Sequence, residues 1–148
     1  MSVEEADEPT AEHRRPPGAS DAAVTAAGRL SEALETIERA RGHLYSFHQL
    51  TGGADALLDE VVSLLREAGE PALAEQVATE LIGRNVLDGR WTFQIVEEYD
   101  DGYYRAFREL ERQVRDHLLQ GRRHIYEAEM KERRRTRGHR AHRARPAQ

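Results

Sequence analysis

The residues best suited to chemistry in this chain are histidines and carboxylates that a helical fold would gather at one end. Imidazole nitrogens and carboxylate oxygens are common metal ligands, and helical bundles build metal sites from such side chains on facing helices. The candidate metal ligands are His43, His48, Asp55, Asp59, Glu97 and Glu98. The alternative is a structural role, because histidine in the last turn of a helix and aspartate in the first turn both oppose the helix dipole.

The spacing of these residues does not favour an enzyme. Neither Glu-x-x-His nor His-Glu-x-x-His occurs in the sequence. His43 and His48 are five positions apart, which does not place two ligands on one helical face. The sequence has no glycine-rich phosphate loop and no nucleophile elbow, and it has no cysteine to act as a thiolate ligand or nucleophile. It therefore indicates no substrate or cofactor, and we expect a protein that is not an enzyme.

Two further patterns leave alternatives open. His124 and Glu127 are three positions apart and would share a helical face, either as a partial metal or acid–base pair or as a solvated surface pair. The acids of "EEYDD", residues 97–101, could hold a cation or simply belong to an acidic first helical turn. The aromatic residues nearby, including Tyr103 and Phe107, follow a helical spacing, and we expect them to be core; the alternative is that tyrosine hydroxyls at this end line a ligand pocket.

The charge distribution separates an acidic body from a basic tail. Residues 131–148 carry a net charge of +7, so the rest of a chain whose net charge is -5 carries -12. Arginine pairs well with phosphate, and the tail could bind nucleic acid weakly or act only as a solubilising end. The candidate nucleic-acid-binding residues are Arg133, Arg134, Arg135, Arg137, Arg140, Arg143 and Arg145.

Hydrophobic periodicity predicts an all-α fold, an antiparallel bundle of about four helices. The predicted helices run from Ser20 or Asp21 to the glycines at 52–53, over 54–68, from Pro71 to about residue 84, and from about Thr92 to about Arg134. The first and last are long, and the middle two form a short hairpin. Continuity of the last helix through Gly121 stays open. Composition predicts a disordered acidic segment over 1–19, a bundle domain over 20–135 and a disordered basic tail over 136–148.

The function expected from these features is a non-enzymatic protein–protein interaction or regulatory module. Long first and last helices would leave apolar surface exposed, which favours a coiled-coil dimer or binding to another protein. A metal-binding or hydrolytic bundle and weak nucleic-acid binding are the alternatives. No apolar run approaches the length of a membrane span, and the start of the chain does not resemble a signal peptide, so we expect a soluble cytoplasmic protein that does not contact a membrane.

Overall fold

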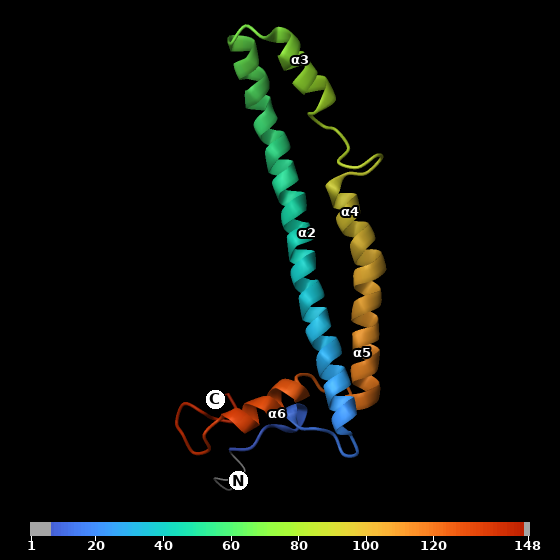
Figure 1. The fold of residues 1–148 in the computed structure, drawn as a ribbon, viewed down its shortest axis with the longest axis vertical. Helices are drawn as coiled ribbons and strands as arrows, with labels where there is room; N and C mark the ends of the chain where they lie inside the picture. Colours follow the sequence, from blue (N-terminus) through green and yellow to red (C-terminus); the bar gives the residue numbers. More distant parts are fainter. Residues whose placement is uncertain (1–6, 147–148) are drawn as a thin grey trace. The chain divides into compact units, whose positions relative to one another are not determined.

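The fold is all-α, as predicted. The computed structural model describes residues 7–146, none of which belongs to a strand (Figure 1). The elements are the 3₁₀ helix η1 (Ala11–His13), α2 (Asp21–Glu67), α3 (Pro71–Glu80), α4 (Thr92–Tyr99), the π-helix η2 (Asp100–Tyr104), α5 (Arg105–Leu119) and α6 (Ile125–Arg134). Among the described residues, no helix is long and apolar enough to cross a membrane.

Two compact units make up the chain. Unit 1 comprises residues 1–36 and 106–148, of which 7–36 and 106–146 are described, and unit 2 comprises residues 37–105. Helix α2 supplies residues to both units. Segments from both ends of the described chain pack together within unit 1. The domain boundaries at residues 19 and 135 stay a prediction.

Helix α2 begins where the sequence predicts and ends later than predicted. Ser20 caps it, since its Oγ accepts the backbone N–H of Ala23 at 3.1 Å. At the far end, Gly69 has φ +78°, and its N–H and that of Glu70 bond back to the carbonyls of Arg66 and Leu65 at 3.1 and 2.9 Å. This Schellman motif ends the helix, so the predicted first two helices are one.

The glycines at 52–53 do not stop α2. Neither has a positive φ, and each costs about 1 kcal/mol relative to alanine inside a helix. Residues on both sides of them, such as His48, Thr51, Leu58 and Val62, lie on a partly or fully buried face. The burial of this face on both sides offsets the weak helix propensity of the two glycines.

The predicted last helix is interrupted twice. Around Gly102 the backbone forms the π-helix η2, and α5 ends at Leu119. Gln120 and Gly121 then adopt left-handed conformations with φ +54° and +74°, which no helix can continue. Helix α6 follows after His124, whose φ of +59° is also left-handed. The predicted last helix is therefore not continuous through Gly121.

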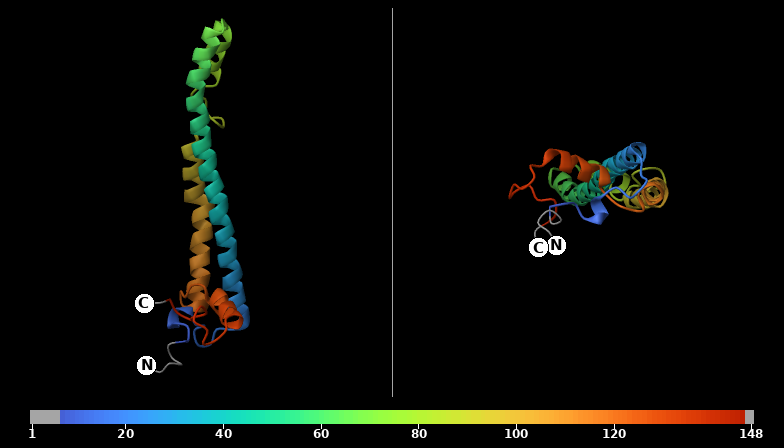
Figure 2. Two further views of the ribbon diagram at one scale, coloured as in Figure 1. Left: turned by 90° about the vertical axis from the view of Figure 1, so that its left-hand side faces the viewer. Right: turned by 90° about the horizontal axis from the view of Figure 1, so that it is seen from below.

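The core of unit 1 lies where α6 meets the start of α2. Val24, Ala27, Leu119 and Ile125 are buried together, and Ile125 is only 1% exposed. Tyr126 packs directly on α2 at Gly28, where an added Cβ would lie 2.7 Å from the Tyr126 Cβ. The ribbon views place α6 beside the first turns of α2 (Figure 2). Small residues on α2 therefore let α6 approach closely.

Unit 2 joins the middle of α2 to α4 and η2 through a polar and aromatic cluster. Asp100 accepts two hydrogen bonds from the Arg41 guanidinium at 2.8 and 3.0 Å, and these bonds hold the pKa of its carboxyl below the ordinary value of 3.8. The rings of Tyr45 and Tyr104 lie 5.2 and 5.1 Å from the Arg41 guanidinium carbon. The Tyr104 hydroxyl donates to Glu38 at 2.8 Å. The π-helix thus positions both Asp100 and Tyr104 against Arg41.

Candidate functional site

The most extensive feature left uncovered by the fold is apolar surface on unit 2. Of the fifteen large hydrophobic side chains exposed among the described residues, thirteen lie within residues 37–105. The same range buries few hydrophobic side chains, namely Val62, Ala74 and Val96. Monomeric proteins seldom leave much contiguous apolar surface exposed, so this surface is a candidate interaction site.

Part of this surface is a regular stripe on α2, here called the α2 seam. It consists of Phe47, Leu50, Ala54, Leu57, Val61 and Leu64, and all six are exposed. The steps between them alternate between three and four residues, which is the a and d spacing of a heptad repeat. Leu50 is 72% exposed and Leu57 is 65% exposed, far more than such positions show in a covered helix. The seam therefore has the pattern of a coiled-coil face without a partner helix.

A second face of α2 is already occupied within unit 2. It begins at Leu44 and continues through His48, Thr51, Asp55, Leu58, Val62 and Leu65, all of which are partly or fully buried. This face follows the same three- and four-residue steps as the seam. Helix α2 thus has two adjacent faces that could pack against helices, and the fold of unit 2 covers one of them.

A hollow of about 480 Å³ adjoins the seam. Its apolar lining comes from Ala54, Leu58, Leu81, Val86 and Trp91. Ala54 belongs to both the seam and the hollow, so the two surfaces are continuous. Asp55 ties the segment after α3 to this region by accepting the backbone N–H of Gly83 at 3.1 Å. The hollow has room for a bulky side chain from a molecule seated on the seam.

The six predicted metal ligands do not come together in this structure. His48 Nδ1 lies 2.7 Å from Thr92 Oγ1, Asp55 bonds to Gly83, and Glu98 pairs with Arg90 at 2.8 Å. His43, Asp59 and Glu97 have exposed side chains. Within residues 7–146, no three of the six place ligand atoms within 4.8 Å of one another. Because α2 continues through residues 52–53, His48 and Asp55 lie in the interior of that helix, and neither occupies the helix end that the dipole argument supposed.

Two acids of the stretch at 97–101 form ion pairs with arginines. Asp100 is bonded to Arg41 and Glu98 to Arg90, so two of its four acids already face a cation. Of the described residues, the group that could hold a metal ion is instead Glu35, His124 and Glu127, whose ligand atoms all lie within 4.8 Å of one another. The sequence indicates the His124–Glu127 half of this group, and the fold adds Glu35.

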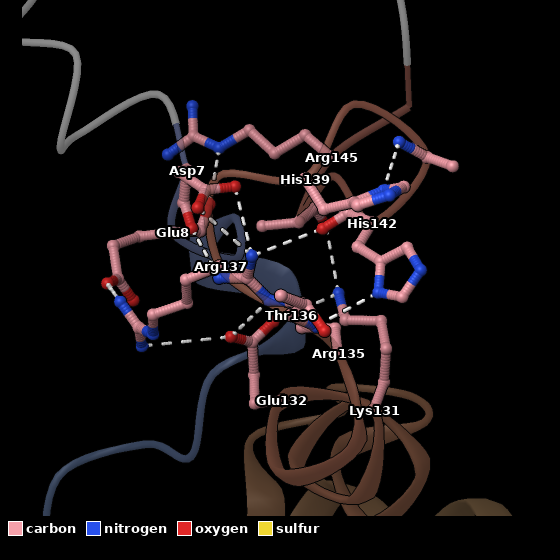
Figure 3. Close-up of polar contacts among 12 residues, drawn as sticks. Asp7, Glu8, Lys131, Glu132, Arg135, Thr136, Arg137, His139, His142 and Arg145 are labelled. Carbon is pink, nitrogen blue, oxygen red and sulfur yellow. Dashed lines mark hydrogen bonds and ion pairs between the residues drawn. The ribbon is translucent and has the colours of Figure 1, made fainter.

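The predicted nucleic-acid-binding arginines fall into two classes, and Figure 3 shows the contacts of the first, which comprises Arg135, Arg137 and Arg145. The Arg135 side chain is only 4% exposed, and it donates to the Asp7 carboxylate at 3.0 and 3.1 Å, to the Asp7 carbonyl at 2.6 Å and to Glu132 at 2.7 Å. Arg137 donates to the Glu8 carboxylate at 2.7 Å, and Arg145 donates to the Glu8 carbonyl at 2.6 Å. These three arginines tie residues near the two ends of the chain together.

The other four predicted arginines are exposed: Arg133, Arg134, Arg140 and Arg143. Nucleic-acid binding stays a prediction that rests on these four. Arg135 and Arg137 lower the pKa of the Asp7 and Glu8 carboxyls by donating hydrogen bonds to them. Residues 7–19 and 136–146, where composition predicts disorder, thus make specific polar contacts, while residues 1–6 and 147–148 lie outside the described part.

The comparisons with known proteins do not assign this arrangement to a family. No family model matches the chain, and neither the curated proteins nor the solved structures contain a match.

The α2 seam is not among the predicted sites, although its heptad spacing is present in the sequence. The heptad spacing runs from residue 47 to residue 64 and crosses the glycines at 52–53. Ending the first helix at those glycines divides the seam between two helices and hides the repeat. The heptad spacing is visible only when residues 47–64 are taken as one continuous helix.

Proposed function

We propose that the protein is a non-enzymatic interaction module that pairs with a second copy of itself through the α2 seam. The observation that carries this proposal is the exposed heptad stripe on a helix whose neighbouring face is already packed. In a left-handed coiled coil, side chains at this spacing insert between four residues of the facing helix. A second α2 seam offers the same spacing and is therefore a self-complementary partner about a two-fold axis.

The size of the seam is compatible with a stable dimer. The five large side chains of the seam each offer on the order of 100 Å², so the seam provides roughly 500 Å² per copy and roughly 1,000 Å² per pair, the lower limit for a specific interface. The hollow beside Ala54 adds further area if a bulky seam side chain of the second copy enters it. The small side chain of Ala54 also allows the two helices to approach closely at this point.

A second copy is favoured over an unrelated partner because unit 2 needs the cover permanently. Its buried hydrophobic residues are Val62, Ala74 and Val96, a small core for residues 37–105. Gly42, Gly52 and Gly53 weaken the helix over the same region, at about 1 kcal/mol each relative to alanine. A partner supplied by the same gene product is always present at the concentration of the chain itself.

The net charge of unit 2 opposes pairing of two copies, and its effect distinguishes a dimer of this chain from a complex with a basic protein. Residues 37–105 contain thirteen acidic residues and six arginines, a net charge of -7. Two copies of unit 2 therefore repel one another, and salt screens that repulsion. A dimer of this kind should become tighter as salt is added, whereas a complex with a basic partner protein should become weaker.

The experiment is sedimentation equilibrium on the full chain and two matched variants. We expect the wild type to show twice the 16.9 kDa chain mass at micromolar concentration. L57E should give the monomer mass, because it places a charge within the seam. L110E is the control, since Leu110 is 57% exposed but lies outside the seam, and it should remain dimeric.

A wild-type chain that stays monomeric throughout the micromolar range would overturn the proposal, as would an L57E variant that dimerises as well as the wild type. If L57E does not fold, the wild type alone still decides. The melting temperature of an obligate dimer rises with protein concentration, whereas that of a monomer does not.

A further inference from the structure

The strongest candidate for a ligand site outside unit 2 is the group Glu35, His124 and Glu127 in unit 1. Glu35 lies on α2, His124 directly precedes α6, and Glu127 lies in the first turn of α6. One imidazole nitrogen and two carboxylate oxygens lie within 4.8 Å of one another, although Glu35 is 89 positions from His124. The group combines two ligand types from separate helices, which distinguishes it from an acidic surface patch.

The donor set points to a divalent transition metal. Imidazole suits zinc, copper, iron and nickel, whereas calcium and magnesium prefer oxygen ligands alone. Tetrahedral zinc with ligands at about 2.1 Å places them roughly 3.4 Å apart, so the ligand atoms need to approach one another by at most about 1.4 Å from their present separations. The Glu35 and Glu127 side chains are at least partly exposed, and each has three rotatable torsions. Rotation of these side chains brings the carboxylates closer to the imidazole.

The backbone that carries two of the ligands is held firmly in place. Ile125 and Tyr126 stand between His124 and Glu127 in sequence, and both are anchored on α2. Ile125 is 1% exposed, and the ring of Tyr126 packs at Gly28 with the Arg29 guanidinium carbon 6.0 Å from its centroid. Rigid support of this kind keeps the side chains that would bind the metal near their binding geometry before the metal arrives.

The charge balance of the group also favours a cation. The carboxylates of Glu35 and Glu127 lie close together, and their negative charges repel one another. Of the described residues, the ion-pair partner of Glu127 is His124, with Nδ1 and Oε2 4.0 Å apart. No arginine or lysine among them lies within ion-pairing distance of either carboxylate. A bound divalent cation would neutralise this charge.

We propose that Glu35, His124 and Glu127 form a three-ligand site for a divalent transition metal, best suited to Zn²⁺. Such a site keeps a fourth coordination position open to solvent, because the chain supplies three ligands. Bound metal would link the start of α6 to α2 within unit 1. The inference does not depend on the α2 seam, which lies entirely in unit 2.

Calorimetric titration of Zn²⁺ into the full-length, untagged and chelator-treated chain tests this site. We expect one equivalent to bind, with a rise in melting temperature that a chelator reverses. H124N and E35Q should each weaken binding at least tenfold, since even groups that only orient a ligand cost about 10- to 100-fold when removed. Asparagine tolerates the left-handed backbone at position 124 better than most residues, so H124N should preserve the fold.

Two control variants exclude other histidines. H43N changes an exposed histidine of unit 2, and H142N changes one member of the histidine pair whose ring centroids lie 4.4 Å apart. Both should bind Zn²⁺ like the wild type. Absence of stoichiometric binding, or binding that is lost in H43N or H142N and retained in H124N and E35Q, would overturn the proposal. Glu35 lies on an exposed helix face, so E35Q should fold and still tests the site if H124N does not fold.

Discussion

Replacing Gly28 with alanine should destabilise the protein, whereas the same replacement at Gly42 should stabilise it. Both glycines lie inside α2 with negative φ, so their helical conformation suits alanine equally well. They differ in their surroundings. An added Cβ at Gly28 would lie 2.7 Å from Cβ and 2.9 Å from Cγ of Tyr126, whereas one at Gly42 would have no atom within 4 Å.

The expected magnitudes come from two opposing terms. Alanine in place of a helical glycine stabilises by about 1 kcal/mol, and this gain is common to both variants. Carbon atoms in contact normally lie about 3.5–4.0 Å apart, so at Gly28 the start of α6 must move by roughly 1 Å. Tyr126 cannot rotate away, because its Cβ is fixed to the backbone. Overpacking of this kind costs about 1–3 kcal/mol, which leaves G28A about 1 kcal/mol less stable than the wild type.

Thermal unfolding of the wild type, G28A and G42A at one protein concentration measures this difference. The two variants should differ by roughly 2 kcal/mol, which corresponds to roughly 4–8 °C in melting temperature for a chain of this size. Because the propensity gain is the same in both, the difference reports only the contact with Tyr126. If G28A were stabilised as much as G42A, α6 would not pack on α2 at Gly28, and the geometry of the proposed metal site would fail with it.

Two further predictions concern ion pairs. Because Arg41 lowers the pKa of Asp100 in the folded state, their pairing contributes stability above pH 3.8, and this contribution is lost as the pH falls through the lower folded pKa. In urea unfolding, D100N should therefore have a lower free energy of unfolding than the wild type at pH 7, and the difference should become smaller towards pH 3. A difference that stays constant with pH would contradict a stabilising ion pair between Arg41 and Asp100. R135Q should release the contacts near the chain ends and speed hydrogen exchange at the Thr136 amide, which donates to His142 Nδ1 at 2.9 Å. The exposed R133Q is its control, and equal exchange in both variants would refute the role of Arg135.

Local sequence signals predicted most helix starts and stops. Ser20 caps α2, Pro71 begins α3 and Gly69 ends the helix before it, all as expected. Each of these depends on one residue and its immediate neighbours, such as a side-chain acceptor, a missing N–H or a left-handed glycine. Gly89, which lies between the third and fourth predicted helices, likewise has a left-handed φ of +71°.

Glycines inside a helical pattern were less informative. Gly52 and Gly53 remain helical, Gly102 lies in a π-helix, and Gly121 is left-handed. Glycine adopts all of these conformations at little steric cost, so its presence alone does not say which one occurs. At residues 52–53 the outcome depended on burial of the adjacent turns, which is a tertiary property.

The sequence by itself determined the helical class and the positions of the helix ends set by local signals. It also contained the heptad spacing of the α2 seam, although only the continuity of α2 makes that spacing one surface. The tertiary structure alone decided which charged residues meet. Arg41 reaches Asp100, Arg135 reaches Asp7, and Glu35 approaches His124 across long sequence separations. Helical periodicity specifies which face of a helix a side chain occupies, but the partner of that face depends on how distant segments pack.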